Sequence, residues 1–237
     1  MIPKVFHRIW LGTQQMPDEF VRYGETWTKH HPGWTMRLWT DENLPELINQ
    51  QEFLLAHSTA HKADIFRYEV IYRYGGVYID TDFECLRNIE PLLQGLNAFV
   101  AKSDPNLVAI GIFGAEQGHP LLADIIAQLP GSFQRKRYLS ITEQTGPDFF
   151  TSVVARHPET VVFEAKLFYP YHWKEKWRKG QEFPDAYAVH HWNGSWTRGD
   201  QQRVTSAPSL RRISSKFRRK LTTLALIAKK WFQPVAL

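Results

Sequence analysis

Cysteine is almost missing from this chain of 237 residues, which has one cysteine, Cys85. A single cysteine excludes an internal disulfide and a cysteine-rich zinc site, so the composition is typical of a reducing compartment. Long apolar runs are also missing, because no stretch approaches the roughly 18 apolar residues that a membrane-spanning helix needs. The N-terminal residues lack the charged start, apolar core and small-residue cleavage site of an export signal. We therefore expect a protein that is neither exported by this route nor transmembrane, and is cytoplasmic.

Acidic residues are absent from residues 201–237, which contain nine basic ones. The chain's net charge of +5, less these nine, leaves −4 for residues 1–200, so the basic excess belongs to the tail. We do not expect nucleic acid as a partner, because no recognised nucleic-acid fold accompanies the basic patch. Apolar residues recur in this tail every three or four positions, at Leu210, Ile213, Phe217, Leu221, Leu224, Ala228 and Trp231.

The spacing in this tail predicts a basic amphipathic helix that lies on an anionic membrane surface. Packing of the same helix on protein is the alternative. The tail thus predicts a peripheral contact with the inner face of the cytoplasmic membrane.

The first 200 residues are typical of one α/β domain. With 43% hydrophobic residues in the chain, there is enough apolar material for one sizeable core. We expect a mostly parallel, doubly wound sheet flanked by helices over residues 1–200, followed by the helical tail of residues 201–237. The patterns predict strands at 3–11, 34–39, 77–82, 97–101, 107–115, 161–163 and 186–190, and helices at 18–30, 44–50, 59–74, 120–129 and 149–156, with a turn-rich loop at 142–148.

The most informative stretch is residues 75–82, GGVYIDTD, where a helix ends on two glycines and a short strand follows. In extended backbone the side chains of Tyr78, Asp80 and Asp82 lie on one side. Two carboxylates held close together repel each other unless a cation lies between them. Hard oxygen ligands favour Mg²⁺ or Mn²⁺, which would suit a diphosphate. The alternative is a surface strand end with two solvated acids.

Two further features carry chemistry that suits such a ligand. Trp10 follows the first strand, where a parallel sheet opens its ligand crevice, although a core tryptophan is the alternative. Asp64 and Arg67 lie three residues apart on one helix face. A guanidinium binds phosphate or carboxylate oxygens in a bidentate manner, and an ordinary ion pair is the alternative.

Four segments, in this order, resemble glycosyltransferase family 32, the transferases with a DXD sugar-binding region. These are IPKVFHRIWLG at 2–12, ADIFRY at 63–68, GGVYIDTD at 75–82 and HHWNGSW at 190–196. The family includes fungal mannosyltransferases and bacterial polysaccharide enzymes, and is distantly similar to clostridial toxin glucosyltransferase domains. The resemblance covers about residues 1–200. It implies a GT-A fold, a nucleotide-sugar donor, Mn²⁺ or Mg²⁺, and retention of anomeric configuration.

The resemblance also implies a metal site. Asp82 matches the acid that binds the metal directly, and Asp80 matches the acid that contacts the sugar or ribose and reaches the metal through water. A third ligand would come from His190 or His191, of which strand alternation allows one to point inward. The predicted catalytic residues are Asp80, Asp82 and Arg67.

The remaining implied residues bind the donor. Trp10 resembles the tryptophan that stacks on the base, and Asp64 with Arg67 resembles the pair that holds the sugar hydroxyls. The other donor-binding candidates are Tyr78 and His7, although alternation places His7 on the opposite face from Trp10. Ser195 and Trp196 resemble residues of a loop that closes over the donor.

We therefore predict a retaining, metal-dependent glycosyltransferase. It would move a hexose from a UDP- or GDP-sugar to a glycan or lipid-linked glycan acceptor in cell-surface polysaccharide synthesis. A nucleotide-sugar hydrolase or nucleotidyltransferase would use the same acids. A non-enzymatic saccharide-binding module is a third interpretation, for which the aromatic residues and the basic tail would suffice.

Overall fold

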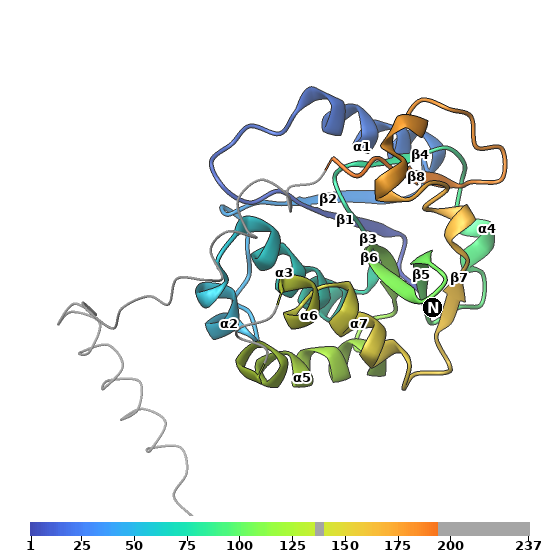
Figure 1. Ribbon diagram of the computed structural model, residues 1–237. Coiled ribbons are helices and arrows are strands. Elements are labelled where there is room, and N and C mark those ends of the chain that lie inside the picture. Colours follow the sequence, from blue (N-terminus) through green and yellow to red (C-terminus); the bar gives the residue numbers. More distant parts are fainter. Residues whose placement is uncertain (136–139, 194–237) are drawn as a thin grey trace, which may run out of the picture. The chain divides into compact units, whose positions relative to one another are not determined.

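The computed structural model describes residues 1–135 and 140–193 (Figure 1). Its centre is a six-stranded sheet in the order β2-β1-β3-β6-β5-β7. Neighbouring strands are parallel in the pairs β1–β2, β1–β3 and β5–β7, whereas β6 runs antiparallel to both β3 and β5. The predicted mostly parallel α/β sheet is thus confirmed. The strands are β1 Val5–Ile9, β2 Thr35–Trp39, β3 Gly76–Ile79, β5 Ala98–Asp104, β6 Leu107–Ala115 and β7 Val161–Phe163.

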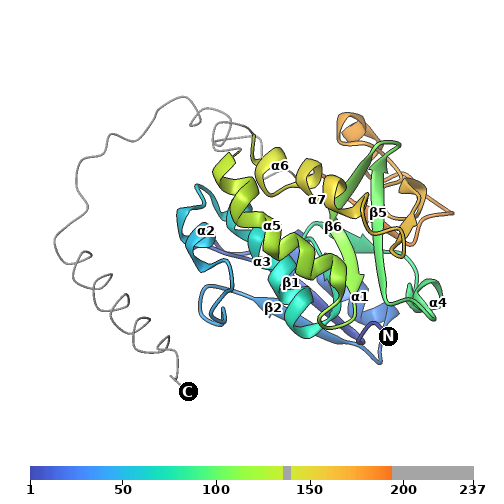
Figure 2. The ribbon, with the colours of Figure 1, turned by 90° about the horizontal axis from the view of Figure 1, so that it is seen from below.

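Helices lie on both faces of this sheet. Successive strand side chains point to opposite faces, so each face carries its own hydrophobic core for helices to cover. Tyr78 of β3 packs with Phe66 and Ile125 on one side, and its neighbours Val77 and Ile79 pack on the other. Figure 2 shows α5 and α3 together in front of the sheet in its view. The helices are α1 Asp18–His30, α2 Gln50–Leu55, α3 Thr59–Tyr74, α4 Glu90–Leu93, α5 Pro120–Arg135, α6 Ile141–Gln144 and α7 Pro147–Val154, with 3₁₀ helices η1 Ala165–Leu167 and η2 Trp173–Arg178.

Helix α3 delivers the chain to β3, and its ends follow from its sequence. Ser58 caps its start, because the Ser58 hydroxyl accepts the backbone N–H of His61 at 3.1 Å. Gly75 ends it with φ of 63°, a left-handed value that favours glycine. Gly76 has φ of 98°, and a Cβ there would lie 2.5 Å from Val5. The two glycines therefore let β3 pass directly beside β1.

Three sequence predictions differ from the structure. The predicted helix at 44–50 is wrong, because α2 begins only at Gln50. The Glu69 carboxylate of α3 instead accepts the backbone N–H groups of Ile48 at 2.7 Å and Asn49 at 2.6 Å, which holds this segment as a loop. The predicted loop at 142–148 overlaps the end of α6 and the start of α7 at Pro147. The predicted strand at 77–82 ends at Ile79. The acids of the DXD motif therefore lie in a turn beyond the strand.

A second, two-stranded sheet pairs β4 (Phe83–Cys85) antiparallel with β8 (Ala188–His190). The register places Phe83 opposite His190. No sequence pattern predicted β4. Its pairing with β8 brings the end of the described domain beside the DXD turn.

Among residues 1–135 and 140–193, no helix combines the length and apolar character that crossing a membrane requires. The predicted division into residues 1–200 and 201–237 ends beyond the described residues, as does the predicted amphipathic helix, so both stay predictions.

Candidate active site

The DXD turn follows the carboxyl end of β3, an interior strand of the sheet. The backbone N–H of Asp80 donates to the Gly111 carbonyl at 2.8 Å, and that of Phe83 donates back to the Asp80 carbonyl at 3.2 Å. Asp80, Asp82 and His190 each point a ligand atom into one spot, with these atoms all within 4.8 Å of one another. His190 Nε2 lies 3.0 Å from Asp82 Oδ1 and 3.6 Å from Asp80 Oδ2. The structure therefore brings the three predicted metal ligands together.

The three side chains perturb one another's proton affinity. Burial alone lowers the pKa of His190, but the carboxylates of Asp82 and Asp80 outweigh it and raise that pKa to about 9. Burial alone raises the pKa of Asp80, but the Arg67 guanidinium and His190 lower it to about 2. The pKa of Asp82 is likewise lowered, because His190 outweighs its burial. Both acids are therefore ionised at neutral pH and favour a cation between them.

Arg67 of α3 is the second charged centre of the site. Its Nη1 donates to Asp80 Oδ1 at 3.0 Å and to the Ile110 carbonyl at 2.9 Å, and its Nη2 lies 3.0 Å from Asp64 Oδ1. The Tyr78 hydroxyl donates to the same Asp80 oxygen at 2.6 Å. Arg67 and Tyr78 thus hold the carboxylate of Asp80. The i, i+3 ion pair between Arg67 and Asp64, given above as the alternative to donor binding, is present.

Asp64 is fully buried beneath Arg67. Burial raises the pKa of Asp64 to about 7, and the opposing effects of Arg67 and of the Thr145 hydroxyl, which donates to Asp64 Oδ2 at 3.1 Å, offset this only in part. With 0% exposure, the Asp64 side chain is not open to solvent. Asp64 contacts Arg67 and Thr145, so it orients the guanidinium that holds Asp80.

Sequence reasoning missed three contributors to this geometry, of which Gly111 on β6 is the first. A Cβ at Gly111 would lie 2.8 Å from Asp80 Oδ2 and 2.9 Å from the Tyr169 hydroxyl. Only glycine leaves room for the Asp80 carboxylate at this position. Such a requirement has no sequence signal, because an isolated glycine in a strand pattern has several possible causes.

The second contributor is the segment after β8. Trp192 has φ of 52°, a left-handed value that is unusual for a bulky residue. The backbone N–H of the next residue, Asn193, donates to Asp82 Oδ2 at 2.9 Å. The Trp192 ring also lies edge-on to His190, with 4.4 Å between ring centroids. The left-handed turn at Trp192 therefore places the Asn193 N–H against Asp82. The Trp192 ring packs against one side of the metal-ligand cluster of Asp80, Asp82 and His190.

The third contributor is Arg8 of β1. Its Nη2 donates to the carbonyl of Thr81, the middle residue of the DXD motif, at 2.7 Å, and to the Phe20 carbonyl at 2.6 Å. Burial lowers the pKa of Arg8 to about 10, against the raising effects of Tyr78 and Asp82. The group stays cationic at neutral pH and ties the DXD turn to α1.

His191 does not join the cluster of Asp80, Asp82 and His190. Its Nε2 lies 2.9 Å from Glu84 Oε2, and its Nδ1 lies 3.3 Å from the Tyr171 hydroxyl. Its ring stacks on Tyr23, with 4.5 Å between centroids. His190 is the last residue of β8 and His191 follows it, and the two side chains enter different clusters, so only one of the two reaches the acids of the DXD motif.

His7 and Trp10 occupy different environments on β1. His7 is 1% exposed, with Nε2 3.0 Å from the Gly75 carbonyl and Nδ1 accepting from the Trp39 indole at 3.1 Å. Burial lowers the pKa of His7 to about 4, so it is a neutral residue of the core with both nitrogens paired. Trp10 is half-buried just after β1, and its indole N–H donates to the Gln14 carbonyl at 2.7 Å. Ser195 and Trp196 lie outside the described residues.

The donor set fits a divalent cation. Two carboxylates and one imidazole offer three ligand atoms on one spot, and carboxylate oxygens suit Mg²⁺ and Mn²⁺. The imidazole favours Mn²⁺ of the two. Asp80, Asp82 and His190 would therefore hold the metal that the resemblance implies.

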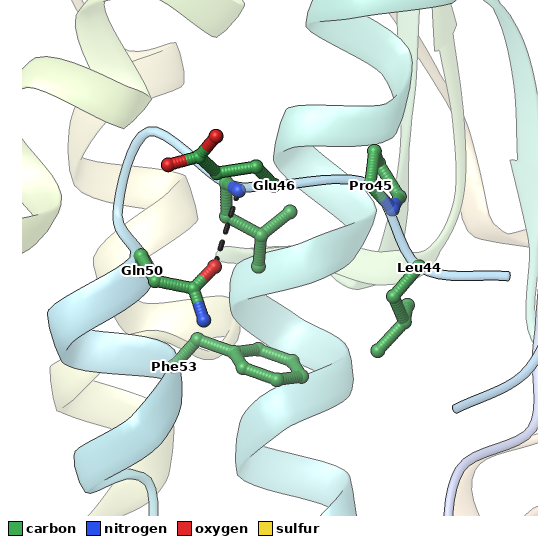
Figure 3. Close-up of a pocket in the computed structure, with 6 residues that line it drawn as sticks. Leu44, Pro45, Glu46, Gln50 and Phe53 are labelled. Atoms are coloured by element: carbon green, nitrogen blue, oxygen red, sulfur yellow. Dashed lines mark hydrogen bonds between the residues drawn. The ribbon is translucent and has the colours of Figure 1, made fainter. Parts of the chain in front are cut away.

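A separate hollow of about 360 Å³ lies at the loop before α2 (Figure 3). No residue of the cluster lines this hollow, so it is not part of the candidate active site. Its walls are Leu44, Pro45, Glu46, Leu47, Gln50 and Phe53.

Comparison with known proteins defines the class of this domain. Residues 17–99 match the family model described as "Glycosyltransferase sugar-binding region containing DXD motif". This range contains Asp64, Arg67, Asp80 and Asp82, whose geometry is given above. The resemblance to the DXD glycosyltransferases is confirmed, and with it the enzyme class: the chain carries a glycosyltransferase domain.

Two relatives from fungi illustrate the similarity at the level of whole sequences. The chain is 31% identical over 198 residues to inositol phosphoceramide mannosyltransferase 3 of Schizosaccharomyces pombe, covering 80% of this chain and 49% of that protein. It is 33% identical over 164 residues to mannosyl phosphorylinositol ceramide synthase CSH1 of Saccharomyces cerevisiae, covering 65% of this chain and 42% of that protein. The chain thus spans about half the length of the curated relatives it matches.

Solved structures agree on the fold. The PaToxG glycosyltransferase superposes with a TM-score of 0.54 at 16% identity, covering 66% of this chain and 70% of that one. The ligand-free glycosyltransferase domain from the YGT toxin gives 0.53 at 9% identity, covering 68% and 80%. The GT-A-type fold is therefore confirmed.

Proposed function

We propose that this chain is a metal-dependent, retaining glycosyltransferase that moves a hexose from a UDP- or GDP-sugar to a lipid-linked or glycan acceptor. One observation carries the proposal. The ligand atoms of Asp80, Asp82 and His190 lie within 4.8 Å of one another beyond the carboxyl end of β3, against the Arg67 guanidinium. Two ionised carboxylates and an imidazole attract a divalent cation, and a cation held there would stabilise the charge of a departing nucleoside diphosphate.

Bound Mn²⁺ or Mg²⁺ would neutralise the charge that develops on the leaving diphosphate. Asp82 and His190 would be the ligands that hold the ion. Arg67 and Tyr78 hold Asp80 by its Oδ1, so its Oδ2 would contribute to the ion and to the donor's sugar or ribose. The buried Asp64 keeps Arg67 in place, and Trp10 offers a partly open indole for the base. We assign no covalent nucleophile.

The acceptor is proposed from the relatives' names. Two of the relatives transfer mannose to inositol phosphoceramide or make its mannosylated product, as their names state. We propose mannose as the first hexose to test, and an acceptor that carries a lipid. The setting would be cell-surface polysaccharide synthesis on the cytoplasmic membrane face, with the tail of residues 201–237 as a peripheral contact.

A donor screen followed by product analysis tests the proposal. UDP- and GDP-sugars are added to the full chain with Mn²⁺, and the correct donor raises the melting temperature by mass action. The chosen donor is then incubated with and without a lipid-linked acceptor. A glycosylated lipid with unchanged anomeric configuration is the expected product. Free sugar released equally in both incubations would show a hydrolase, and nucleotide binding without any product would show a binding module.

A further inference from the structure

A short segment beside the candidate active site exposes two tryptophans. Trp177 is 73% exposed and Trp173 is 50% exposed, both on η2. Tryptophan is highly buried on average, and a pair of exposed indoles in one six-residue helix marks an interaction surface. Neither tryptophan belongs to the four segments that resemble the DXD transferases.

Cations surround the two indoles. Lys179 is paired with Glu19 of α1 at 2.7 Å, and Arg178 donates to the Pro170 carbonyl at 3.1 Å. Lys174 and Lys176 are exposed, and the described residues provide neither with an acidic partner. The Lys174 ammonium lies 5.3 Å from the centre of the Trp173 ring. We call Trp173, Lys174, Lys176 and Trp177 the tryptophan–lysine surface.

The tryptophan–lysine surface is tied to the metal-ligand cluster. His172 caps η2, and its ring centroid lies 6.2 Å from that of Trp192. The Trp192 indole donates to the Tyr171 carbonyl at 2.9 Å and lies edge-on to His190. Figure 1 shows the orange segment that contains η2 beside α1, β4 and β8. A ligand on this surface would therefore lie next to the cluster.

We propose that the tryptophan–lysine surface docks on an anionic lipid bilayer and so presents a lipid-borne acceptor to the site. Indole rings prefer the boundary between headgroups and acyl chains, where an apolar ring and a polar N–H are both satisfied. Unpaired ammonium groups beside them are attracted to anionic headgroups. Stacking on a sugar would need the rings alone, so the cations favour a membrane over a soluble glycan. The role in acceptor delivery rests on the proposed function, whereas the docking itself does not.

Vesicle binding of the full chain tests the docking. The vesicles combine phosphatidylcholine and phosphatidylglycerol at about two to one, with pure phosphatidylcholine as the uncharged comparison. We expect Lys174→Glu/Lys176→Glu to lower the partition coefficient about tenfold or more on the anionic vesicles. The matched variant Lys29→Glu/Lys62→Glu reverses two charges elsewhere and should lower it far less. The tail is present in every variant, so its own contribution stays constant.

Fluorescence quenching by brominated acyl chains tests insertion of the rings. The test uses the Trp231→Phe background, which removes the tail's indole. We expect brominated chains to quench the fluorescence of this protein, and we expect Trp173→Phe/Trp177→Phe to abolish most of that quenching. Equal quenching with and without these two tryptophans, together with equal vesicle binding of the lysine variants, would overturn the proposal. So would unchanged vesicle binding with a raised KM for a water-soluble glycan acceptor, which would mark a sugar platform. The vesicle and quenching assays contain no nucleotide-sugar donor, so they measure docking independently of catalysis. Docking without any transferase activity would therefore refute the proposed function and leave the docking proposal standing.

Discussion

His190 and His191 are consecutive residues, yet they belong to two different polar clusters. His190 lies 3.0 Å from Asp82 and near Asp80, in a cluster that fits a divalent cation. His191 lies 2.9 Å from Glu84 and stacks on Tyr23, within a network that ties the end of the domain to α1. The difference shows that position, rather than residue type, decides the environment of each histidine, since His190 ends β8 and His191 follows it.

The number of acids in each cluster adds to this contrast. Two carboxylates raise the pKa of His190 to about 9, an environment in which a metal ion could replace the proton. His191 faces one carboxylate and one hydroxyl, enough to satisfy both of its nitrogens. We therefore expect changes in the first cluster to remove activity and changes in the second to alter stability.

The largest effect is expected from Asp82→Asn. An amide keeps the shape of the carboxylate but loses the charge that holds the metal, so kcat/KM should fall about 10³-fold or more. The matched control is Glu84→Gln, the same chemical change on the His191 side, which should cost less than about tenfold. Steady-state kinetics at several Mn²⁺ concentrations measure both. Similar losses in the two variants would show that the two clusters do not differ in their importance for activity.

The next effect separates the histidines themselves. His190→Gln should lower kcat/KM about 10²-fold and raise the Mn²⁺ concentration needed for half-maximal activity. His191→Gln should leave that concentration unchanged and instead lower the free energy of unfolding by about 1–2 kcal/mol, because Glu84 loses its partner. Metal titrations of activity and urea denaturation provide the two readouts. A shifted metal requirement in His191→Gln would contradict the assignment.

The sequence predicted more of this site than of its surroundings. Asp80 and Asp82 were singled out by alternation in a segment expected to be extended, and Arg67 by its place three residues after Asp64 on one helix face. Their catalytic roles were predicted from the resemblance to the DXD transferases. The sheet and the bounds of α1 and α3 followed from apolar periodicity. Local rules sufficed wherever neighbours in the chain are neighbours in space.

Long-range pairing explains what was missed. Gly111 matters only because β6 lies beside β3, and Asn193 reaches Asp82 only because β8 pairs with β4. His7 was predicted as donor-binding, but Trp39 of the neighbouring strand and Gly75 occupy its two nitrogens. None of these contacts has a periodic signal, because each joins residues whose separation in the chain is arbitrary.

A smaller effect tests how the first cluster is supported. Arg67→Lys keeps the positive charge but loses the fork that spans Asp64 and Asp80, so kcat/KM should fall about ten- to a hundredfold. Asp64→Asn should act through Arg67, and the double variant should therefore lose less than the two single losses combined. A double-mutant cycle in kcat/KM measures this coupling. Full additivity would mean that Asp64 contacts the donor independently.

The smallest effect concerns a third buried histidine, which belongs to neither cluster. His61 is 0% exposed, neither ring nitrogen has a hydrogen-bond partner, and its ring stacks on Phe133 at 5.2 Å. Burial lowers the pKa of His61 from 6.5 to about 4. Between these values the unfolded chain binds more protons than the folded one, so stability is complete above pH 6.5 and is lost as the pH falls towards 4.

His61→Leu should remove this acid sensitivity without removing a hydrogen bond. Between pH 7 and pH 4 both proteins should lose free energy of unfolding. The loss in the variant should be smaller than in the wild type by up to about 3 kcal/mol. At pH 7 the variant should be as stable as the wild type or more so, because it no longer buries two unsatisfied nitrogens. Urea denaturation at both pH values measures the difference. The comparison variant His57→Leu removes only the weaker effect of the exposed His57 on His61, so it should change the acid sensitivity far less. If His61→Leu kept the full acid loss, the source of acid sensitivity would lie in other groups, and the first cluster, with its ionised pair of acids, would be the next place to look.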